Sequence, residues 1–304
     1  MVEFLYNKWY NKSMKNWLKN SRIVITGASS GIGKELTKIL IKKYNCFVLG
    51  VARNKERLEQ AKDCLQVIKE STEDSNVVVE DYSANFDYVV ADVSKKEDWA
   101  VILEKAKQIN CNILINNAGT MLPFLKAENI SNEEIEKIFD TNFYSIVNGS
   151  RLFCEYFKTK NEKCGIVNIT SVAAVCSMPG QSAYSASKSA ATSYSKIMSS
   201  ELKGKVFVGT YLPGFTKTNL FKTADNSSPI FDEKLLKLLD IISMPAEKLA
   251  NKIVKKISKK KRYKVFGLDS KLYRFLNIIA PSKSTDLYLK IFKKTKNQSF
   301  KNLF

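Results

Sequence analysis

A tyrosine and a lysine one helical turn apart are the first candidates for chemistry in this sequence. Tyr184 and Lys188 lie in the segment SAYSASK at residues 182–188, and side chains four residues apart share one face of a helix. An isolated phenol has a pKa of about 10, which an adjacent ammonium lowers by ~1–3 units. The pair therefore predicts a tyrosine that exchanges a proton with a substrate oxygen near neutral pH.

The same spacing occurs a second time, at Tyr156 and Lys160. Because the chain has 13 tyrosines and is rich in lysine, such pairs also arise by chance. The first pair differs in that Ser171 follows an apolar run at residues 165–170, thirteen positions before its tyrosine. The equivalent position before the second pair is Phe143, which has no hydroxyl. The serine, together with the first pair, is therefore the candidate site.

The elements around the candidate site alternate between strands and helices from residue 21 onward. Near-continuous apolar strands separated by helices predict a parallel sheet with helices on both faces. Residues 70–85 are polar and acidic and indicate a surface loop without function. The expected strands cover residues 22–26, 46–51, 86–90, 113–115, 165–170, 206–211 and 262–266, and the expected helices cover 34–44, 55–69, 95–109, 131–158, 184–202 and 246–257.

A glycine-rich turn joins the first expected strand to the first expected helix, with Gly27, Gly31 and Gly33 as its glycines. Such a turn lets backbone N–H groups approach a pyrophosphate, and the helix N-terminus adds a positive dipole end. A plain strand-turn-helix connection is the alternative. After the second strand the sequence has Arg53 where an acidic residue would select NAD. Because a guanidinium pairs with a 2′-phosphate, NADP(H) is favoured over NAD(H); the alternative is a solvated basic helix start.

These motifs, in this order, resemble the short-chain dehydrogenase/reductase family from about residue 21 to residue 218. The resemblance implies an α/β fold, a Rossmann-type doubly wound parallel sheet in a single domain. It further implies that Tyr184 is the general acid, that Lys188 lowers its pKa and holds the nicotinamide ribose, and that Ser171 polarises the substrate carbonyl. Asn142 would bend the long helix and hold a water that links the lysine to solvent.

The resemblance also implies which residues contact the cofactor. The segment Asn116–Gly119 would steady the central sheet beside it, and residues 213–218 would touch the nicotinamide. The complete set is Gly27, Ser29, Ser30, Gly31, Ile32, Gly33, Arg53, Asp92, Val93, Asn117, Ala118, Gly119, Tyr184, Lys188, Pro213, Gly214, Thr216 and Thr218.

The expected function is that of an NADP(H)-dependent oxidoreductase that interconverts a carbonyl and a secondary alcohol. We expect an apolar or acyl-type small-molecule substrate, in a pocket shaped by residues 121–126, 172–181 and 220–239, and a homo-oligomer, either a dimer or a tetramer. The alternative is a catalytically silent NADP(H)-binding regulator or a membrane-associated scaffold. Titration with NADPH separates the scaffold from the other two classes, because a scaffold would not bind it.

Positive charge is concentrated at the two ends of the chain. The net charge is +19, of which residues 251–304 carry +14 and residues 1–20 carry +3, so that +2 remains for the middle. We expect an amphipathic extension at 1–20 (with Met1 or Met14 as the start), a catalytic domain at 21–267 and a basic helical tail at 268–304. The tail suits a substrate lid, a dimer contact or an anionic membrane surface; a general lysine bias is the alternative. The scarcity of arginine argues against nucleic-acid binding.

The composition excludes several classes of site. With no histidine, a Ser-His-Asp triad and His-ligated metals are impossible. The six cysteines have no metal-ligand spacing and suggest buried free thiols in a reducing cytoplasm. No apolar run reaches the ~18 residues of a membrane span, and the start lacks the apolar region of a secretory signal. We therefore expect no metal and a cytoplasmic protein, peripheral on the membrane if the basic ends bind it.

Overall fold

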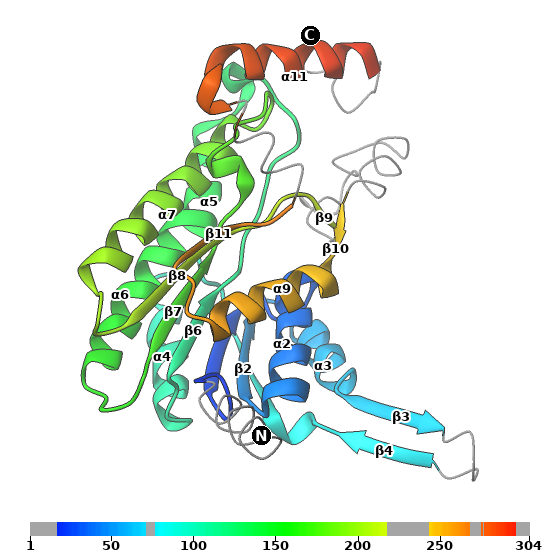
Figure 1. The fold of residues 1–304 in the computed structure, drawn as a ribbon, viewed down its shortest axis with the longest axis vertical. Coiled ribbons are helices and arrows are strands. Elements are labelled where there is room, and N and C mark those ends of the chain that lie inside the picture. The colour runs from blue at the N-terminus through cyan, green and yellow to red at the C-terminus, as the bar shows by residue number, and fades with distance from the viewer. Residues whose placement is uncertain (1–16, 71–76, 218–242, 268–274, 276, 296–304) are drawn as a thin grey trace, which may run out of the picture.

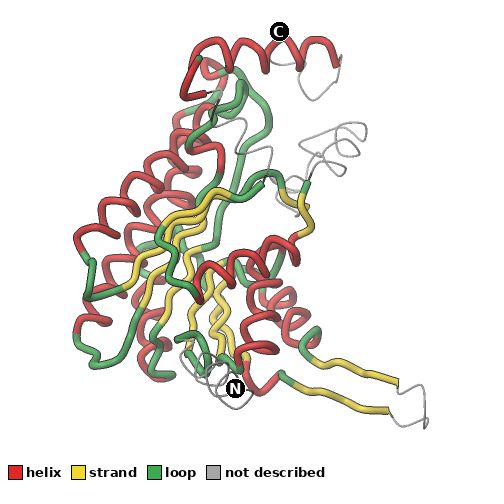
Figure 2. The backbone as a smooth tube through the Cα atoms, in the orientation of Figure 1, coloured by secondary structure: helices red, strands yellow, loops and turns green. Residues whose placement is uncertain are grey.

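A seven-stranded parallel sheet forms the centre of the protein (Figures 1 and 2). The computed structural model describes residues 17–70, 77–217, 243–267, 275 and 277–295. The sheet has the order β5-β2-β1-β6-β7-β8-β11. Its strands are β1 (Arg22–Thr26), β2 (Phe47–Ala52), β5 (Phe86–Val90), β6 (Ile113–Asn116), β7 (Gly165–Ile169), β8 (Phe207–Leu212) and β11 (Tyr263–Val265).

Helices cover both faces of this sheet, as Figure 1 shows. One face carries α2 (Gly31–Tyr44), α3 (Lys55–Asp63) and α9 (Ala246–Ser258); the other carries α4 (Asp98–Gln108), α5 (Asn132–Phe139), α6 (Ser145–Lys158) and α7 (Ser182–Glu201). The strands are apolar on both sides because both sides are covered, and the core accordingly forms two buried clusters, one on each face. The α/β doubly wound fold expected from the sequence is confirmed.

The order of the strands determines where the sheet opens. The chain proceeds outward from β1 through β2 to β5, then returns to β6 and proceeds the other way through β7, β8 and β11. In a parallel sheet, ligands bind outside the carboxyl ends of the strands at the point where this order reverses. The segments that follow β1 and β6 therefore face one crevice.

Residues 66–81 correct the expected pattern. The helix predicted for 55–69 ends at Asp63, and the predicted loop at 70–85 contains strand residues. Strands β3 (Gln66–Glu70) and β4 (Val77–Asp81) pair antiparallel and project from the body of the protein (Figure 1). A short helical turn, η1 (Ser83–Asn85), then leads into β5. The β-branched residues at 77–79 favour a strand, and the surrounding polar residues conceal that preference in the sequence.

The long helix expected at 131–158 is interrupted once. A π-helical segment, η3 (Asp140–Tyr144), separates α5 from α6, and Asn142 is buried within it. One extra residue per turn is a common feature of functional sites. The π-helical segment thus lies at the position where the family resemblance implies a local bend.

Residues 17–20 form a turn packed against the body of the protein. The indole Nε1 of Trp17 donates a hydrogen bond to the carbonyl of Ile257 (3.0 Å), and its ring meets Phe207 edge-on, with 5.4 Å between ring centroids. Leu18 is completely buried. The amphipathic helix expected at 1–20 otherwise lies outside the described residues.

The C-terminal segment folds against the end of the molecule that carries the start of α7 (Figure 1). Its helix α11 (Pro281–Thr295) matches the lysine-rich helix expected after the proline. The side-chain amide of Asn277 donates a hydrogen bond to the carbonyl of Val175 (3.0 Å), and Ser284 Oγ donates one to Asn277 Oδ1 (3.1 Å). Residues 268–274, 276 and 296–304 of the expected tail lie outside the described residues.

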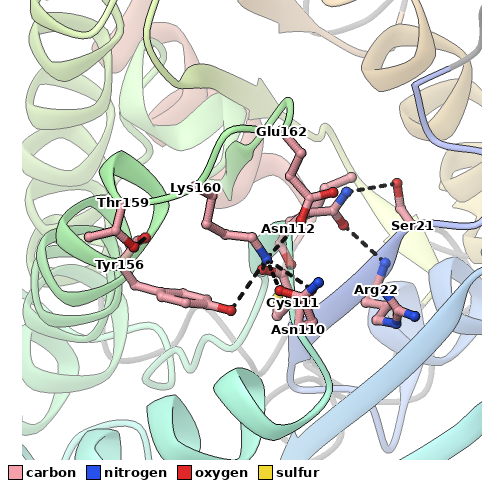
Figure 3. A network of polar contacts seen from close by, with 10 residues as sticks. Ser21, Arg22, Asn110, Cys111, Asn112, Tyr156, Thr159, Lys160 and Glu162 are labelled. Atoms are coloured by element: carbon pink, nitrogen blue, oxygen red, sulfur yellow. Dashed lines mark hydrogen bonds and ion pairs between the residues drawn. The ribbon is translucent and has the colours of Figure 1, made fainter.

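The second tyrosine–lysine pair forms a structural contact at the amino ends of the strands (Figure 3). Lys160 Nζ donates hydrogen bonds to the Tyr156 hydroxyl (3.3 Å), to Asn110 Oδ1 (2.6 Å) and to the carbonyl of Cys111 (2.8 Å), and it lies 2.8 Å from Glu162 Oε1. Burial opposes its charge, but the hydrogen bonds to Glu162 and Tyr156 outweigh that effect, so the pKa of Lys160 lies above its ordinary value. The pair ties the loop before β6 to the end of α6.

Lys160→Met should lower the free energy of unfolding by about 2 kcal/mol, because it removes the donor to the carbonyls of Asn110 and Cys111 and the ion pair with Glu162. Lys158→Met is the matched control, since Lys158 is exposed at the end of the same helix. Urea unfolding followed by circular dichroism measures both. Equal stability of the two variants would show that the contacts of Lys160 contribute nothing.

Candidate active site

A cleft of about 630 Å³ opens at the carboxyl ends of the parallel strands. It collects residues that the sequence places far apart, because each follows a different strand. Of the predicted site residues, those that line it are Gly27, Ser29, Ser30, Gly31, Ile32, Arg53, Asp92, Val93, Asn117, Ala118, Gly119, Ser171, Tyr184, Lys188, Pro213, Gly214 and Thr216. Gly33 and Asn142 lie behind the wall of the cleft, and Thr218 lies outside the described residues.

The glycine-rich turn after β1 leaves room where a side chain would not fit. Gly27 and Gly31 have φ values of 67° and 52°, the left-handed region that favours glycine. A Cβ at Gly33 would lie 2.1 Å from the carbonyl oxygen of Gly27, so only glycine lets α2 begin this close to the turn. Ser30 precedes α2 with no side-chain cap, which leaves the helix N-terminus open to an anion. The turn therefore fits a pyrophosphate.

Backbone contacts between β1 and β6 fix the floor of the cleft. Thr26 Oγ1 accepts hydrogen bonds from the N–H groups of Asn117 (2.9 Å) and Ala118 (3.0 Å). The Asn117 side chain in turn donates to the carbonyl of Thr26 (3.0 Å). Behind them, Asn116 Nδ2 donates to Asn168 Oδ1 (2.8 Å), so the buried amides link β6 to β7. These hydrogen bonds link β1, β6 and β7 at the carboxyl ends of the strands.

Arg53 lies at the far end of the cleft, after β2. Its side chain is 74% exposed, and Nη1 lies 3.9 Å from Asp92 Oδ2. The Asp92 carboxylate is held by the N–H (3.0 Å) and hydroxyl (2.7 Å) of Ser94. Arg57 also lines this end. The guanidinium of Arg53 is therefore free to turn toward an anionic group without breaking a close ion pair.

The side chains of Ser171, Tyr184 and Lys188 meet in the middle of the cleft. Lys188 Nζ lies 5.9 Å from the centroid of the Tyr184 ring, and Ser171 Oγ also accepts from the N–H of Ala173 (3.1 Å). Burial lowers the pKa of Lys188 to about 8. The ammonium therefore predominates below about pH 8 and the neutral amine above it.

The pKa of Tyr184 corrects an expectation. Burial raises it above the ordinary value for a phenol, and a hydrogen bond with the Ser171 side chain offsets this only in part. The sequence spacing predicted a lowered pKa from Lys188. In the protein itself burial in low-dielectric surroundings determines the direction of the shift. The phenol is consequently in its protonated form at neutral pH.

Asn142 acts on the segment after β6 and not on the cleft directly. Its side-chain Nδ2 donates to the carbonyl of Thr120 (2.9 Å) and to Ser187 Oγ (3.1 Å), and its Oδ1 accepts from the N–H of Thr120 (2.9 Å). A Cβ at Gly119 would lie 3.0 Å from Lys188 Nζ and 3.2 Å from Asn142 Oδ1. The asparagine and glycine together define the space that the lysine occupies.

The remaining wall of the cleft is only partly anticipated by the sequence. From the expected pocket segments, Met121, Leu122, Pro123, Val172, Ala173, Cys176, Met178 and Gln181 line it, whereas 220–239 lie outside the described residues. Gln181 Nε2 donates to the carbonyl of Leu122 (3.1 Å) and so joins two of these segments. Glu134, Lys137 and Ile138 of α5 and Thr141 of the π-helical segment also line the cleft, and the sequence did not predict them.

The structure also shows where the cysteines lie and whether the described residues could form a metal site or a membrane-spanning helix. Five cysteines are buried and free, but Cys64 is exposed, which corrects the expectation that all six are buried. Among the described residues there is no group of three or more cysteine, aspartate or glutamate side chains that could hold a metal ion. No helix among them is long and apolar enough to cross a membrane.

The sequence of this chain is similar to those of known dehydrogenases. A sequence model of the family described as short chain dehydrogenase matches residues 21–228. The 11-beta-hydroxysteroid dehydrogenase 1A of Arabidopsis thaliana is 34% identical over 201 residues, which cover 65% of this chain and 53% of that relative. The chain thus matches about half the length of this curated relative.

Solved structures share the fold. The 3-ketoacyl-(acyl-carrier-protein) reductase of Brucella melitensis, complexed with NADH, has a TM-score of 0.67 at 23% identity, covering 83% of this chain and 97% of that one. A short-chain dehydrogenase of Sphingobium yanoikuyae, in complex with NADPH, has a TM-score of 0.64 at 23% identity, covering 81% and 87%. Proteins of this fold thus bind NAD(H) in some cases and NADP(H) in others.

Gly33→Ala should displace the turn, because the new methyl group meets backbone at Gly27 and that backbone cannot yield as a flexible side chain would. We expect a loss of about 2 kcal/mol of stability from overpacking and the loss of measurable NADPH binding. Gly204→Ala is the control: its φ is 87° and its surroundings are open, so it costs only the ~1 kcal/mol of backbone strain. Thermal unfolding and NADPH fluorescence titration measure both effects. Normal NADPH affinity in Gly33→Ala would contradict the role of the turn.

Proposed function

The chain belongs to the short-chain dehydrogenase family, and from this we propose that it is an NADP(H)-dependent oxidoreductase that interconverts a carbonyl and a secondary alcohol. The observation that carries the proposal is the convergence of Ser171, Tyr184 and Lys188 in the cleft that begins at the glycine-rich turn. Both a phosphate cradle and a proton donor are present, and the cleft joins them. The nicotinamide would supply the hydride.

Tyr184 would give its phenolic proton to the carbonyl oxygen during reduction. The raised pKa caused by burial keeps this proton in place at neutral pH, which suits a general acid. The hydrogen bond of Ser171 with the phenol brings a second donor to the same point, where it would polarise the carbonyl. For oxidation of an alcohol the same phenol must first lose its proton, so we propose that reduction is the favoured direction near neutral pH.

Lys188 would hold positive charge beside the phenol as the proton leaves. Its side chain is buried, and no described residue accepts a hydrogen bond from Nζ. A ribose hydroxyl of the cofactor would provide that acceptor. Asn142 would position the lysine through Thr120 and Gly119, whose backbone borders Nζ.

NADP(H) is the proposed cofactor because both side chains at the end of the cleft after β2 are cationic. Arg53 and Arg57 line this end, and a 2′-phosphate would pair with a guanidinium. Asp92 is the nearest carboxylate to Arg53 and is already bonded to Ser94. Asp92 also follows β5, whereas an NAD-selecting acid would stand after β2.

The proposed substrate is an apolar ketone or an acyl-type oxo compound. The wall beyond Tyr184 carries Met121, Leu122, Val172 and Met178, and apolar side chains of this kind bind apolar groups. The relatives named above as acting on a hydroxysteroid and a 3-ketoacyl group fit the same chemistry. We further propose that residues 21–267 are the catalytic unit and that the enzyme assembles as a dimer or tetramer, which light scattering would test.

Tyr184→Phe should lower the turnover number by about 1,000-fold, the usual scale of a lost general acid, and should leave NADPH affinity within a few-fold. Tyr156→Phe is the matched control, because its hydroxyl contacts only Lys160 at the opposite end of the strands. NADPH oxidation is followed across apolar ketones, oxoacyl thioesters and sugars. A Tyr184→Phe enzyme of undiminished turnover would overturn the mechanism, and a wild-type chain that fails to bind NADPH would overturn the proposed function.

Arg53→Ala should weaken NADPH binding by roughly 10- to 100-fold, the equivalent of a lost hydrogen bond to a charged group, and should leave NADH binding unchanged. Lys55→Ala serves as control because it removes a neighbouring exposed charge that does not line the cleft. Fluorescence titration with each nucleotide gives the two dissociation constants. Equal weakening of NADPH and NADH binding would refute recognition of the 2′-phosphate by Arg53.

A further inference from the structure

The C-terminal segment exposes a group of large apolar side chains. Phe275, Ile278, Ile279, Leu287 and Ile291, here called the apolar patch, are each between 46% and 68% exposed. Only four other large hydrophobic side chains in the described part of the chain are comparably exposed, and those are spread over β5, α4, α7 and the π-helical segment. Concentration of exposed apolar groups in one segment marks an interaction surface.

Two polar side chains of this segment, Asn277 and Ser284, make hydrogen bonds with the body of the protein and with each other. Asn277 donates to the carbonyl of Val175, and Ser284, which is buried, donates to Asn277. On a helix with 100° per residue, Ile278 and Ile279 lie 100° and 200° from Asn277 and therefore on the side turned away from the body. A helix that serves only the stability of the protein would place its apolar side inward. Here the five large apolar side chains of the patch are exposed instead.

Basic side chains accompany the apolar patch. Lys283, Lys290 and Lys294 are exposed and, by helical spacing, lie on the same side of α11 as Leu287 and Ile291. Asp286 is the one acidic residue of α11. Apolar side chains surrounded by lysine are the pattern of a helix that lies in the interface of an anionic membrane.

We propose that the apolar patch, together with these three lysines, docks the protein on an anionic lipid surface. A second copy of the chain is a poorer occupant, because a two-fold interface would bring the lysines of one patch against those of the other. An apolar helical face with cations at its border instead matches the acyl chains and headgroups of lipid. The proposed attachment is to the membrane surface, and no described helix is both long and apolar enough to cross a membrane.

Docking would also orient the cleft. Val175, to which Asn277 is bonded, lies between residues that line the cleft on both sides, Val172, Ala173, Cys176 and Met178. The bound surface would thus hold the substrate end of the cleft close to the lipid. If the proposed function is correct, an apolar ketone dissolved in the membrane could enter the cleft from there; docking itself is measured without reference to activity.

The test is co-sedimentation of the full chain with vesicles of equimolar phosphatidylcholine and phosphatidylserine, and with vesicles of phosphatidylcholine alone. The combined variant Lys283→Gln, Lys290→Gln, Lys294→Gln should bind the anionic vesicles about 100-fold more weakly, since each lysine near such a surface contributes roughly fivefold. The combined variant Lys96→Gln, Lys105→Gln, Lys107→Gln is the charge-matched control, because those lysines are exposed around α4. It should bind like the wild type.

The apolar contribution has its own variant. Leu287→Ser with Ile291→Ser should weaken vesicle binding by tenfold or more, as expected when two half-exposed aliphatic side chains no longer enter the interface. Ile197→Ser, which changes an equally exposed residue of α7, should bind normally. Circular dichroism confirms that each variant is folded.

A second measurement detects directly whether the apolar patch enters the lipid. Cys64 is the one exposed cysteine, so a Cys64→Ser chain carrying Ile279→Cys takes an environment-sensitive fluorophore at the patch. Its emission should shift to the blue with anionic vesicles, and the same label at Ile197→Cys should not shift. No vesicle binding by the wild-type chain, equal effects of patch and control variants, or a dimer that the Leu287→Ser, Ile291→Ser variant dissociates without any lipid binding would each overturn the proposal.

Discussion

A buried cation on α7 governs the arrangement of the site. Lys188 is only 3% exposed, and the loss of water lowers its pKa to about 8. A charge in such a position is tolerated only where neighbouring structure is fixed. Gly119 leaves the space that Nζ occupies, and Asn142 holds the adjoining backbone of Thr120 from both sides. Asn142 lies in the π-helical segment and is completely buried there.

Burial shifts the pKa values of Tyr184 and Lys188 in opposite directions. It raises the pKa of Tyr184 and lowers that of Lys188, so both groups are driven toward their neutral forms. At neutral pH the phenol keeps its proton while the amine is still largely protonated. A carbonyl oxygen that gains negative charge in the cleft would meet a proton donor, a second hydroxyl at Ser171 and a cation nearby. Ser171 connects the two halves of the arrangement, because its strand pairs with β6 and its side chain reaches α7.

Sequence reasoning recovered the parts of the site that follow from order along the chain. Residues that directly follow buried strands must meet at one edge of a parallel sheet, and Arg53 and Ser171 are found there. The sequence did not predict features that depend on how deeply a side chain is buried or on which side of a helix faces the cleft. The spacing of a tyrosine and a lysine does not encode how far they are buried, so the direction of the Tyr184 pKa was wrong. Similarly, which side of α5 faces the cleft depends on packing, and Glu134 was missed for that reason.

The two tyrosine–lysine pairs show what converts a spacing into chemistry. Tyr184 and Lys188 both lie on α7, whereas Lys160 follows the end of α6, which carries Tyr156. Only Lys160 makes a direct hydrogen bond to its tyrosine. Lys160 Nζ also binds Glu162, Asn110 and the carbonyl of Cys111. Its hydrogen-bond donors are therefore already used and are not available to a ligand. Lys188 stands farther from its tyrosine and has no described acceptor. An unsatisfied donor beside an open cleft can act on a bound molecule, whereas a satisfied one stabilises the fold. The Tyr184–Lys188 pair can therefore act on a bound ligand, because Lys188 Nζ has no described acceptor in the protein.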